Sequence, residues 1–302
     1  MKQYDVAIIG AGPAGLTAGI YTARYGLKTV IIDKGLPGGT AMWAGHIKNY
    51  PGFEEISGME LMTKFTEHAK KCGAEIMEGT ITSIKDLGKE KEVVLQGESL
   101  KVKAVIVAVG AKSKWLKVPG EKEYLNKGVH FCATCDGPMY QGKNVAIIGY
   151  DSRAADEALY LAEVASKVTM VCSKSALTAD AAKQKLIKEK KIDVLTDTKV
   201  VSFKGTQFLE EINLKDAKGK VSTLKATGAF VYIGSEPNTE FVNVKKDEQG
   251  RIVINQSMET SVKGIFAAGD CIKKELNQIA TCVGEGAIAA HSAARLLQST
   301  SE

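Results

Sequence analysis

Residues 6–15 read VAIIGAGPAG, an apolar run that ends in a glycine-rich turn. The run predicts a buried strand over residues 6–9, and a helix is expected over residues 13–25. A second apolar strand follows at residues 29–32 and leads into Asp33. Continuous apolar strands are typical of parallel sheets covered on both faces. The pattern therefore predicts a βαβ unit of the Rossmann type.

The glycines of this turn match the G-x-G-x-x-G pattern of dinucleotide-binding loops. In such a loop Gly10 permits the tight turn, Gly12 lets the backbone approach a pyrophosphate, and Gly15 lets helix and strand pack closely. The helix N-terminus offers free N–H groups to the phosphates, and Asp33 would accept from a ribose hydroxyl. We predict dinucleotide binding here, with a purely structural turn as the alternative.

A second unit of the same form occurs further along the chain. Residues 144–149 read NVAIIG, with a helix expected at 154–165 and a strand at 167–172. The first unit does not finish its domain before this point, because apolar strands ending in glycine recur at residues 105–110 and 264–270, the latter followed by a helix at 284–297. The fold class predicted is α/β, with two Rossmann-like domains. Each domain is expected to have three layers, two of β-sheet and one of α-helix (ββα).

The repeated units predict that one domain is inserted into the other. The first domain takes residues 1–113 and 240–302, and the central domain takes residues 114–239. Pro-Gly and Pro-Asn pairs near the two crossing points suit turns.

Composition excludes several classes of protein. The chain has 302 residues, 44% of them hydrophobic and 25% charged, which are globular values. The apolar runs are too short for a membrane span or a secretory signal, so we expect a cytoplasmic protein with no membrane partner. A formal charge of +5 indicates a solvated surface or a patch for an acidic partner. Basic runs with interleaved aromatics are missing, so no nucleic-acid partner is expected.

Residues 131–137 read FCATCDG and hold the only closely spaced cysteine pair in the sequence. Cys132 and Cys135 can close a small disulfide ring at a helix start, where a thiol pKa is lowered. A zinc site would need a second pair, so no metal is predicted. Asp136 is a candidate to move a proton when a sulfur leaves, or else a turn residue. The other four cysteines are expected to be buried and inert.

Over essentially its full length the chain resembles the low-molecular-weight thioredoxin reductases of bacteria and archaea. The resemblance rests on several ordered matches, at residues 10–15, 38–40, 49–52, 108–111, 132–137, 237–239 and 266–270. It implies a homodimer with an FAD domain and an inserted disulfide domain. It also implies that Cys135 accepts electrons from the flavin, that Cys132 attacks the disulfide of thioredoxin, and that Asp136 serves as proton donor and acceptor.

The resemblance further assigns a set of FAD-binding residues. They are Gly10, Gly12, Pro13, Ala14, Gly15, Asp33, Lys34, Gly39, Thr40, Asn49, Gly110, Ala111, Gly269, Asp270, Gln278 and Ile279. Two departures are mild: Thr40 stands where the family commonly has glutamine, and Asn277 where it has arginine.

The second glycine loop departs further from the family. Residues 149–154 read GYDSRA where the family has G-G-G-x-x-A, so Asp151 brings an anion to the place that a pyrophosphate would approach. Like charges about 4 Å apart repel by roughly 1 kcal/mol in water and by more at lower dielectric. Of the basic cluster that grips the 2′-phosphate of NADPH, only Lys174 remains, and one point charge does not replace bidentate arginines. NADPH use is therefore doubtful, although Arg153 offers another phosphate contact.

These observations favour a thioredoxin reductase whose electrons come from reduced ferredoxin, with a reduced deazaflavin as a further donor. Ferredoxins are acidic, which agrees with the positive charge. Four alternatives stay open: an NADPH-dependent reductase with a divergent site, a dithiol oxidase that uses O₂, a flavoprotein without catalysis, and a ferredoxin:NADP oxidoreductase, against which the dithiol speaks.

Overall fold

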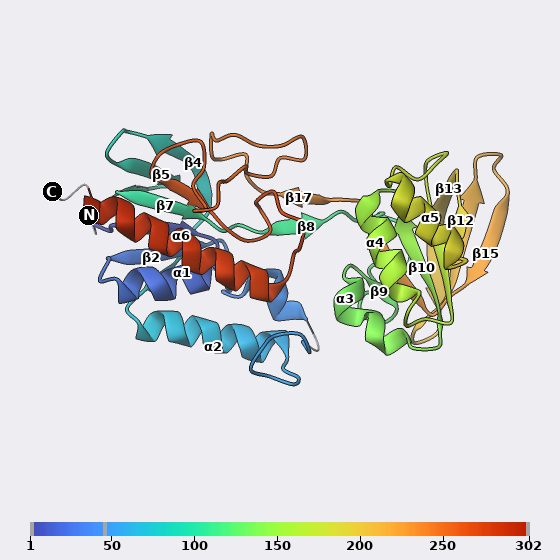
Figure 1. Cartoon of the computed structure of the whole chain (residues 1–302). Coiled ribbons are helices and arrows are strands. Elements are labelled where there is room, and N and C mark those ends of the chain that lie inside the picture. The colour runs from blue at the N-terminus through green and yellow to red at the C-terminus, as the bar shows by residue number, and fades with distance from the viewer. Residues whose placement is uncertain (1–2, 45–46, 300–302) are drawn as a thin grey trace. The chain divides into compact units, whose positions relative to one another are not determined.

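The computed structural model describes residues 3–44 and 47–299, and the chain divides into two compact units. One unit comprises Met1–Lys112 and Glu236–Glu302, and the other comprises Ser113–Ser235 (Figure 1). The second is therefore inserted into the first, with crossing points one and four residues before those expected at 113/114 and 239/240. Strands β8 (Ala111–Ser113) and β17 (Ser235–Pro237) pair with each other at the two crossings.

The first unit is built on a five-stranded sheet whose order is β18-β7-β1-β2-β3, with every pairing parallel. All residues of β1, β7 and β18 are buried, which explains the continuous apolar runs in the sequence. The strands are β1 (Val6–Ile9), β2 (Thr29–Asp33), β3 (Glu75–Glu78), β7 (Ala104–Val107) and β18 (Ile265–Ala267).

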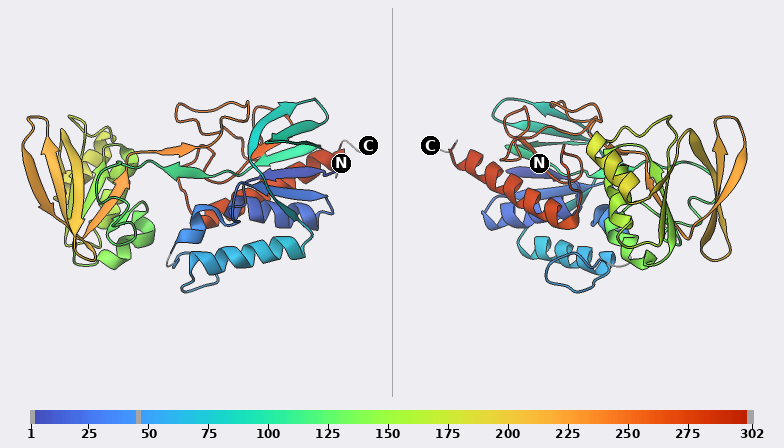
Figure 2. Two further views of the ribbon diagram at one scale, coloured as in Figure 1. Left: turned by 180° about the vertical axis from the view of Figure 1, so that it is seen from behind. Right: turned by 45° about the vertical axis from the view of Figure 1, so that its right-hand side comes forward.

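Helices and a second sheet cover the two faces of this parallel sheet. Helices α1 (Pro13–Arg24) and α6 (Ile279–Ser299) run side by side, and α2 (Gly58–Lys71) lies next to α1 (Figure 1). Seen from behind in Figure 2, the strands lie in front of α6. The second sheet is antiparallel and consists of β4 (Ile81–Asp86), β5 (Lys91–Leu95) and β6 (Ser99–Val102). A short 3₁₀ helix, η1, spans Gly39–Trp43.

The inserted unit repeats the plan with a five-stranded parallel sheet of order β12-β11-β10-β16-β9. Its strands are β9 (Val129–His130), β10 (Asn144–Gly149), β11 (Lys167–Val171), β12 (Asp193–Leu195) and β16 (Gly228–Tyr232).

The central strand β10 places alternate side chains in the apolar cores on the two faces of the sheet. Val145 and Ile147 pack with helices α4 (Ser152–Leu161) and α5 (Ala181–Glu189). Ala146 and Ile148 belong to the core on the other face, which is covered by the antiparallel strands β13 (Thr198–Gly205), β14 (Leu209–Asp216) and β15 (Val221–Lys225). Side chains alternate along a strand, so both faces of β10 are apolar. Each unit has ββα layers, and the predicted fold class is confirmed.

Two helices begin at other residues than the sequence indicated. Helix α4 begins at Ser152 rather than 154 because the Asp151 carboxylate accepts a hydrogen bond from the Ala154 N–H, 2.9 Å away, and caps the helix. It also ends earlier, at Leu161 rather than 165. Helix α6 begins at Ile279 rather than 284. Gly286 within it is needed for packing, since a Cβ there would overlap the carbonyl of Ala14 in α1, whereas a Cβ at Gly284 would meet nothing within 4 Å.

Within residues 3–44 and 47–299, no helix combines the length and the apolar character needed to cross a membrane.

Candidate functional site

The first glycine loop has the shape expected of an anion cradle. Gly10 has a φ of +106°, and a Cβ there would overlap the carbonyl of Ala108 on the neighbouring segment. A Cβ at Gly15 would overlap the Gly10 carbonyl, whereas a Cβ at Gly12 would meet nothing within 4 Å. The loop is therefore tight behind Gly10 and Gly15 and open in front of Gly12, as a bound pyrophosphate requires.

The N-terminus of α1 presents uncapped N–H groups to this open space. Gly12 is the N-cap residue, it has no side chain to accept a bond, and the first turn holds no acidic residue. Pro13 and Ala14 begin the helix. An uncapped helix start with its partial positive charge is a favourable place for an anion.

Asp33 lies at the end of β2 and fixes the loop. Its Oδ2 accepts a hydrogen bond of 2.7 Å from the Ala11 N–H, and its Oδ1 accepts one of 3.2 Å from the Gly35 N–H. The carboxylate is half-buried and thus still accessible to a ribose hydroxyl. Lys34 beside it is exposed.

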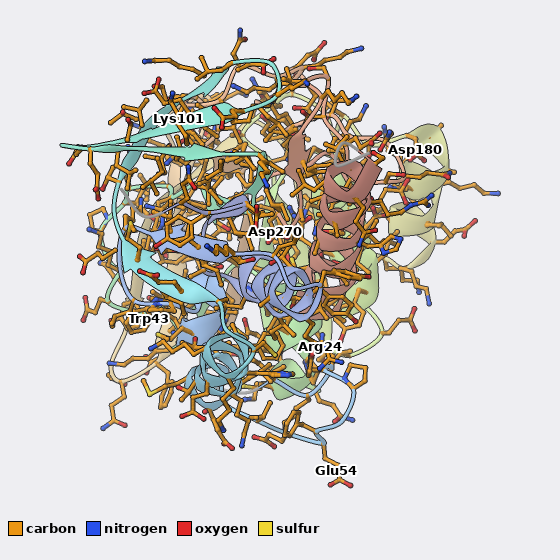
Figure 3. The ribbon with its side chains drawn as sticks, turned by 90° about the vertical axis from the view of Figure 1, so that its left-hand side faces the viewer. Arg24, Trp43, Glu54, Lys101, Asp180 and Asp270 are labelled. Atoms are coloured by element: carbon orange, nitrogen blue, oxygen red, sulfur yellow. A yellow bond between two sulfur atoms is a disulfide. The ribbon has the colours of Figure 1, made fainter. Side chains whose placement is uncertain are left out.

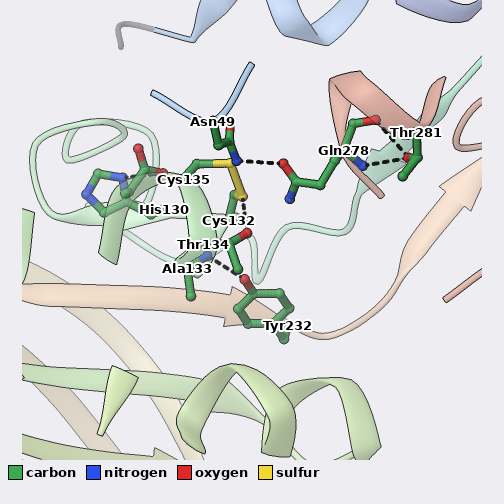
Figure 4. Close-up of a disulfide and its surroundings, with 10 residues drawn as sticks. Asn49, His130, Cys132, Ala133, Thr134, Cys135, Tyr232, Gln278 and Thr281 are labelled. Carbon is green, nitrogen blue, oxygen red and sulfur yellow. Dashed lines mark hydrogen bonds and ion pairs between the residues drawn. A yellow bond between two sulfur atoms is a disulfide. The ribbon is translucent and has the colours of Figure 1, made fainter. Parts of the chain in front are cut away.

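Further predicted residues gather in the same unit. Asn49 Nδ2 donates to Gln278 Oε1 over 3.0 Å (Figure 4), just before Ile279 at the start of α6. Gly39 opens η1 with a φ of +59°, and its ideal Cβ lies 3.2 Å from the Cα of Gly12. The remaining predicted positions are Thr40 on η1, Gly110 at a φ of +63°, and Ala111 at the start of β8.

Asp270 after β18 belongs to an ion cluster (labelled in Figure 3). Lys274 Nζ lies 3.1 Å from Asp270 Oδ1 and 2.9 Å from Glu285 Oε2. Glu285 Oε2 also accepts a 2.8 Å bond from the N–H of Gly269. Burial would lower the pKa of Lys274, but the surrounding negative groups outweigh burial and raise it, so the ammonium stays charged. The cluster holds the Asp270 carboxylate in place at the end of its strand.

The dithiol lies in the inserted unit. Cys132 and Cys135 form a disulfide with a Cα–Cα distance of 5.3 Å (Figure 4). Cys132 is the N-cap residue of the short helix α3 (Ala133–Asp136) and is half-buried, whereas Cys135 is exposed. The Thr134 hydroxyl is 3.4 Å from Cys132 Sγ. The pair is thus accessible, as thiol–disulfide exchange requires.

Asp136 lies at the end of α3 beside a buried histidine. Its Oδ2 is 3.1 Å from Nδ1 of His130, which is 2% exposed. On the other side of the ring, Nε2 is 2.7 Å from the hydroxyl of Tyr140, on the 3₁₀ helix η2 (Gly137–Tyr140). Asp136 thus has an ionisable partner that the sequence prediction did not include.

The second glycine loop is closed by its own side chains. The Asp151 carboxylate occupies the N–H of Ala154, which in an open loop would face a phosphate. Lys174 lies with Nζ 5.6 Å from the ring centre of Tyr150. The guanidinium of Arg153 lies 5.5 Å from the ring centre of Tyr232. One N–H of the anion-binding start of α4 is therefore already taken by a carboxylate of the chain itself.

Tyr232 links this loop to the dithiol. Its hydroxyl accepts a 2.6 Å bond from the N–H of Ala133, the residue after Cys132 (Figure 4). Burial raises the pKa of the Tyr232 phenol far above its usual range. Burial also raises the pKa of Glu157, against the charge of Arg153 and a bond from Tyr232. The second glycine loop therefore supports the start of α3, because Arg153 lies on the ring of Tyr232 and Tyr232 bonds to Ala133.

Three of the four remaining cysteines are buried, as expected, namely Cys172, Cys271 and Cys282. Burial raises the pKa of Cys271 to about 12, which leaves it an inert thiol at neutral pH. Cys72 was expected to be buried and is not. It is partly exposed because it follows the end of α2 at the surface.

Sequence reasoning missed His130, Tyr140, Tyr232, Lys274 and Glu285. His130 stands two positions before Cys132, and this closeness to the dithiol was a usable signal. The other four contact the site only through the fold, and no short-range pattern marks them.

Comparisons with known proteins agree with this geometry. A model of the family described as "Pyridine nucleotide-disulphide oxidoreductase" matches residues 4–286. A thioredoxin reductase of Bacillus subtilis (strain 168) is 43% identical over 307 residues, covering 100% of this chain and 97% of that protein.

Solved structures show the same similarity. A thioredoxin reductase from Streptococcus pyogenes MGAS5005 has a TM-score of 0.91 at 37% identity, over 98% of this chain and 99% of that one. A ferredoxin-flavin thioredoxin reductase from Clostridium acetobutylicum has a TM-score of 0.56 at 31% identity, over 100% and 99%.

Proposed function

The chain belongs to the pyridine nucleotide-disulphide oxidoreductases and, within them, to the low-molecular-weight thioredoxin reductases, and we propose that it reduces the disulfide of thioredoxin with electrons from a donor other than NADPH. The enzyme is an FAD-dependent oxidoreductase, as the sequence predicted. Thioredoxin as substrate follows the names of its relatives. A cytoplasmic homodimer, as expected from the sequence, is part of the proposal.

The residues of the first unit fit FAD. The open space before Gly12 and the uncapped start of α1 suit a pyrophosphate. Asp33 suits the ribose, and Asp270 suits a second polyol because Lys274 and Glu285 hold it in place. FAD, when bound and reduced by the donor, would supply the two electrons that convert the Cys132–Cys135 disulfide into the dithiol. The residues assigned to it in the sequence remain part of this proposal.

The dithiol then passes the two electrons on. The Cys132 thiolate attacks the disulfide of thioredoxin, and a mixed disulfide forms while the departing sulfur takes a proton. The Cys135 thiolate attacks Cys132, which releases the second thioredoxin sulfur and re-forms the disulfide. Asp136 supplies the proton to the departing sulfur.

One observation carries the proposal on the electron donor: the two glycine loops differ at their helix starts. Gly12 leaves the first uncapped, whereas the Asp151 carboxylate caps the second and fills the phosphate position with a negative charge. Lys174 is exposed and is the only basic residue within 172–178. We infer that reduced ferredoxin is the donor, in keeping with the ferredoxin-flavin thioredoxin reductase among the similar structures and with the net charge of +5.

A donor-independent experiment tests the disulfide chemistry. The flavin of the purified holoenzyme is reduced with dithionite, the excess is removed, and oxidised thioredoxin is added under argon. Wild type is expected to release free thioredoxin thiols and to return to oxidised flavin. Cys135→Ser is expected to trap thioredoxin as a mixed disulfide through Cys132, and Cys132→Ser to trap none.

The matched control is Cys172→Ser, which alters a buried thiol in the same unit and is expected to behave as wild type. Wild-type flavin that stays reduced while thioredoxin stays oxidised would show that thioredoxin is not the substrate. Oxidation of a small dithiol by O₂ without thioredoxin would support the dithiol oxidase instead.

A further inference from the structure

A buried histidine stands behind the proposed proton donor of the dithiol. His130 lies on β9, is 2% exposed, and stacks on Phe230 of β16 with ring centres 5.3 Å apart. Its two nitrogens face different partners: Nε2 faces the Tyr140 hydroxyl at 2.7 Å, and Nδ1 faces Asp136 Oδ2 at 3.1 Å. A buried imidazole with a polar partner on each side has a defined orientation and a defined tautomer.

The tyrosine decides which nitrogen of His130 carries the proton. Burial, with a smaller effect of the Asp136 charge, raises the pKa of Tyr140 to about 12. The phenol therefore keeps its proton at neutral pH, and in the proposed arrangement it donates that proton to Nε2. A neutral imidazole that accepts at Nε2 carries its own proton on Nδ1, and Nδ1 is the atom that faces Asp136.

The contact between Nδ1 and Asp136 is within ion-pair distance, although Nδ1 makes no well-aligned hydrogen bond. The Asp136 side chain is 29% exposed and can rotate, whereas the buried ring is fixed. At 3.1 Å, a small rotation of the carboxylate aligns it with Nδ1. Catalytic hydrogen bonds are often poorly aligned before substrate binds.

We propose that His130, oriented by Tyr140, is a positioning residue that directs its Nδ1–H at Asp136 and so assists proton release to the departing sulfur. The inference rests on the proposed thiol–disulfide exchange at Cys132 and Cys135. When Asp136 gives its proton to the sulfur, a carboxylate remains, and the Nδ1–H stabilises that carboxylate.

The surroundings of His130 allow the sign of the pH effect to be worked out. Asp136 of α3 and Tyr140 of η2 face the ring, Phe230 of β16 is uncharged, and Lys143 Nζ lies 5.5 Å from the ring centre of Tyr140. Since Nδ1–H favours the ionised carboxyl group, removing it makes Asp136 hold its proton to higher pH. The part of the pH–rate profile that depends on Asp136 should move to higher pH.

The test compares pH–rate profiles of thioredoxin reduction by the holoenzyme with chemically reduced flavin. Asp136→Asn first identifies the limb of the pH–rate profile that depends on this residue. His130→Phe, which keeps a ring on Phe230, should move that alkaline limb up by about one pH unit and lower the rate on the low-pH plateau, where Asp136 is protonated in both proteins, by roughly threefold. His130→Asn places an amide N–H near the Nδ1 position and should recover part of both. Tyr140→Phe should shift the limb in the same direction by less.

A matched control exists in the other unit, where His291 Nδ1 lies 2.8 Å from the Tyr25 hydroxyl at the surface. His291→Phe should leave the profile unchanged. A folded His130→Phe protein with an unmoved limb would overturn the inference, and so would equal rates in His130→Phe and His130→Asn.

A second measurement does not depend on thioredoxin. Nitrogen-15 NMR of histidine-labelled holoenzyme should show the Nδ1–H tautomer of His130 in wild type and a mixture in Tyr140→Phe. An Nε2–H tautomer in wild type would overturn the inference. Failure of wild type to reduce thioredoxin would contradict the proposed function alone, and the tautomer would still decide the role of His130.

Discussion

At the residue scale, Asp151 shows how one carboxylate changes the use of a loop. It accepts from the N–H of Ala154 and thereby closes the helix start that would otherwise receive a phosphate. The sequence predicted the electrostatic conflict at this position. The cap itself became visible only in the structure, because aspartate is favoured both at helix N-caps and in turns.

Asp151→Gly should therefore reopen the loop. Glycine is nearly as good an N-cap as aspartate, so the free energy of unfolding should fall by only a few tenths of a kcal/mol. Removing a repulsion of about 1 kcal/mol should tighten NADH binding about fivefold or more. Calorimetric titration of the holoenzyme with NADH measures the change.

The matched control for this variant is Asp180→Gly. Asp180, labelled in Figure 3, caps α5 in the same way, by accepting from the Lys183 N–H over 2.9 Å. It should leave NADH binding unchanged. An Asp151→Gly protein that binds NADH no better than wild type would show that the cap does not exclude the nucleotide.

Asp5 illustrates how a residue next to a strand gives stability that depends on pH. Its Oδ1 lies 2.8 Å from Lys103 Nζ, and its Oδ2 accepts a 2.9 Å bond from the Lys28 N–H. Burial would raise the pKa of Asp5, but the bonds from these two residues outweigh burial and hold it below its ordinary value. A lowered folded pKa gives stability above the unfolded pKa, and that stability is lost as pH falls through the folded value.

Asp5→Asn should accordingly lower the free energy of unfolding at pH 7 by about 1 kcal/mol, after allowance for solvent screening. The deficit should shrink as pH falls below about 4, since the wild-type carboxyl group becomes neutral as well. Denaturant unfolding at pH 7 and near pH 3 measures it. Glu163→Gln, which breaks an exposed ion pair with Lys190, should have almost no effect. An equal deficit at both pH values would contradict the assignment.

At the scale of elements, different glycines of the first loop are needed for packing and for cofactor binding. Gly15→Ala forces a Cβ into the Gly10 carbonyl and should destabilise the protein by about 1–3 kcal/mol. Gly12→Ala meets no protein atom within 4 Å and should keep the stability of the apoprotein within about 1 kcal/mol. Its Cβ enters the space assigned to the pyrophosphate, so FAD should bind at least about tenfold more weakly.

Thermal unfolding of the apoprotein and fluorescence titration with FAD measure the two effects separately. A Gly12→Ala protein that binds FAD as tightly as wild type would place the pyrophosphate elsewhere.

The elements that the sequence predicted are those in which periodicity and glycine spacing agree. Residues 6–9 and 144–149 are buried strands followed by glycine turns, and both were predicted together with their helices. The antiparallel strands over 81–102 and 198–225 were not, because half-buried strands with mixed polar faces give a weak signal. The sequence prediction began α6 at Gly284, whereas the helix begins at Ile279 and holds both Gly284 and Gly286 in its interior.

The residues of the candidate site also differ in whether the sequence alone predicts them. Cys132, Cys135 and Asp136 follow from one short motif, and His130 stands two positions before it. Tyr232, in contrast, reaches the dithiol only because β16 lies beside β9, and Tyr140 reaches His130 through η2. Such contacts depend on which strands are neighbours, and no local pattern in the sequence encodes that order.

At the scale of the whole molecule, the chain repeats one ββα plan twice and uses the two copies differently. The first keeps an open glycine loop, and the second closes its loop with Asp151 and carries the dithiol. The central claim is that electrons enter from a carrier other than NADPH.

Anaerobic reduction of the flavin tests this claim most directly. The holoenzyme is titrated with NADPH, then NADH, then reduced ferredoxin, with thioredoxin present, and the flavin absorbance is followed. We expect no bleaching by either nucleotide and sustained turnover with ferredoxin. Bleaching by micromolar NADPH would contradict it and would show that the closed second loop still admits the nucleotide.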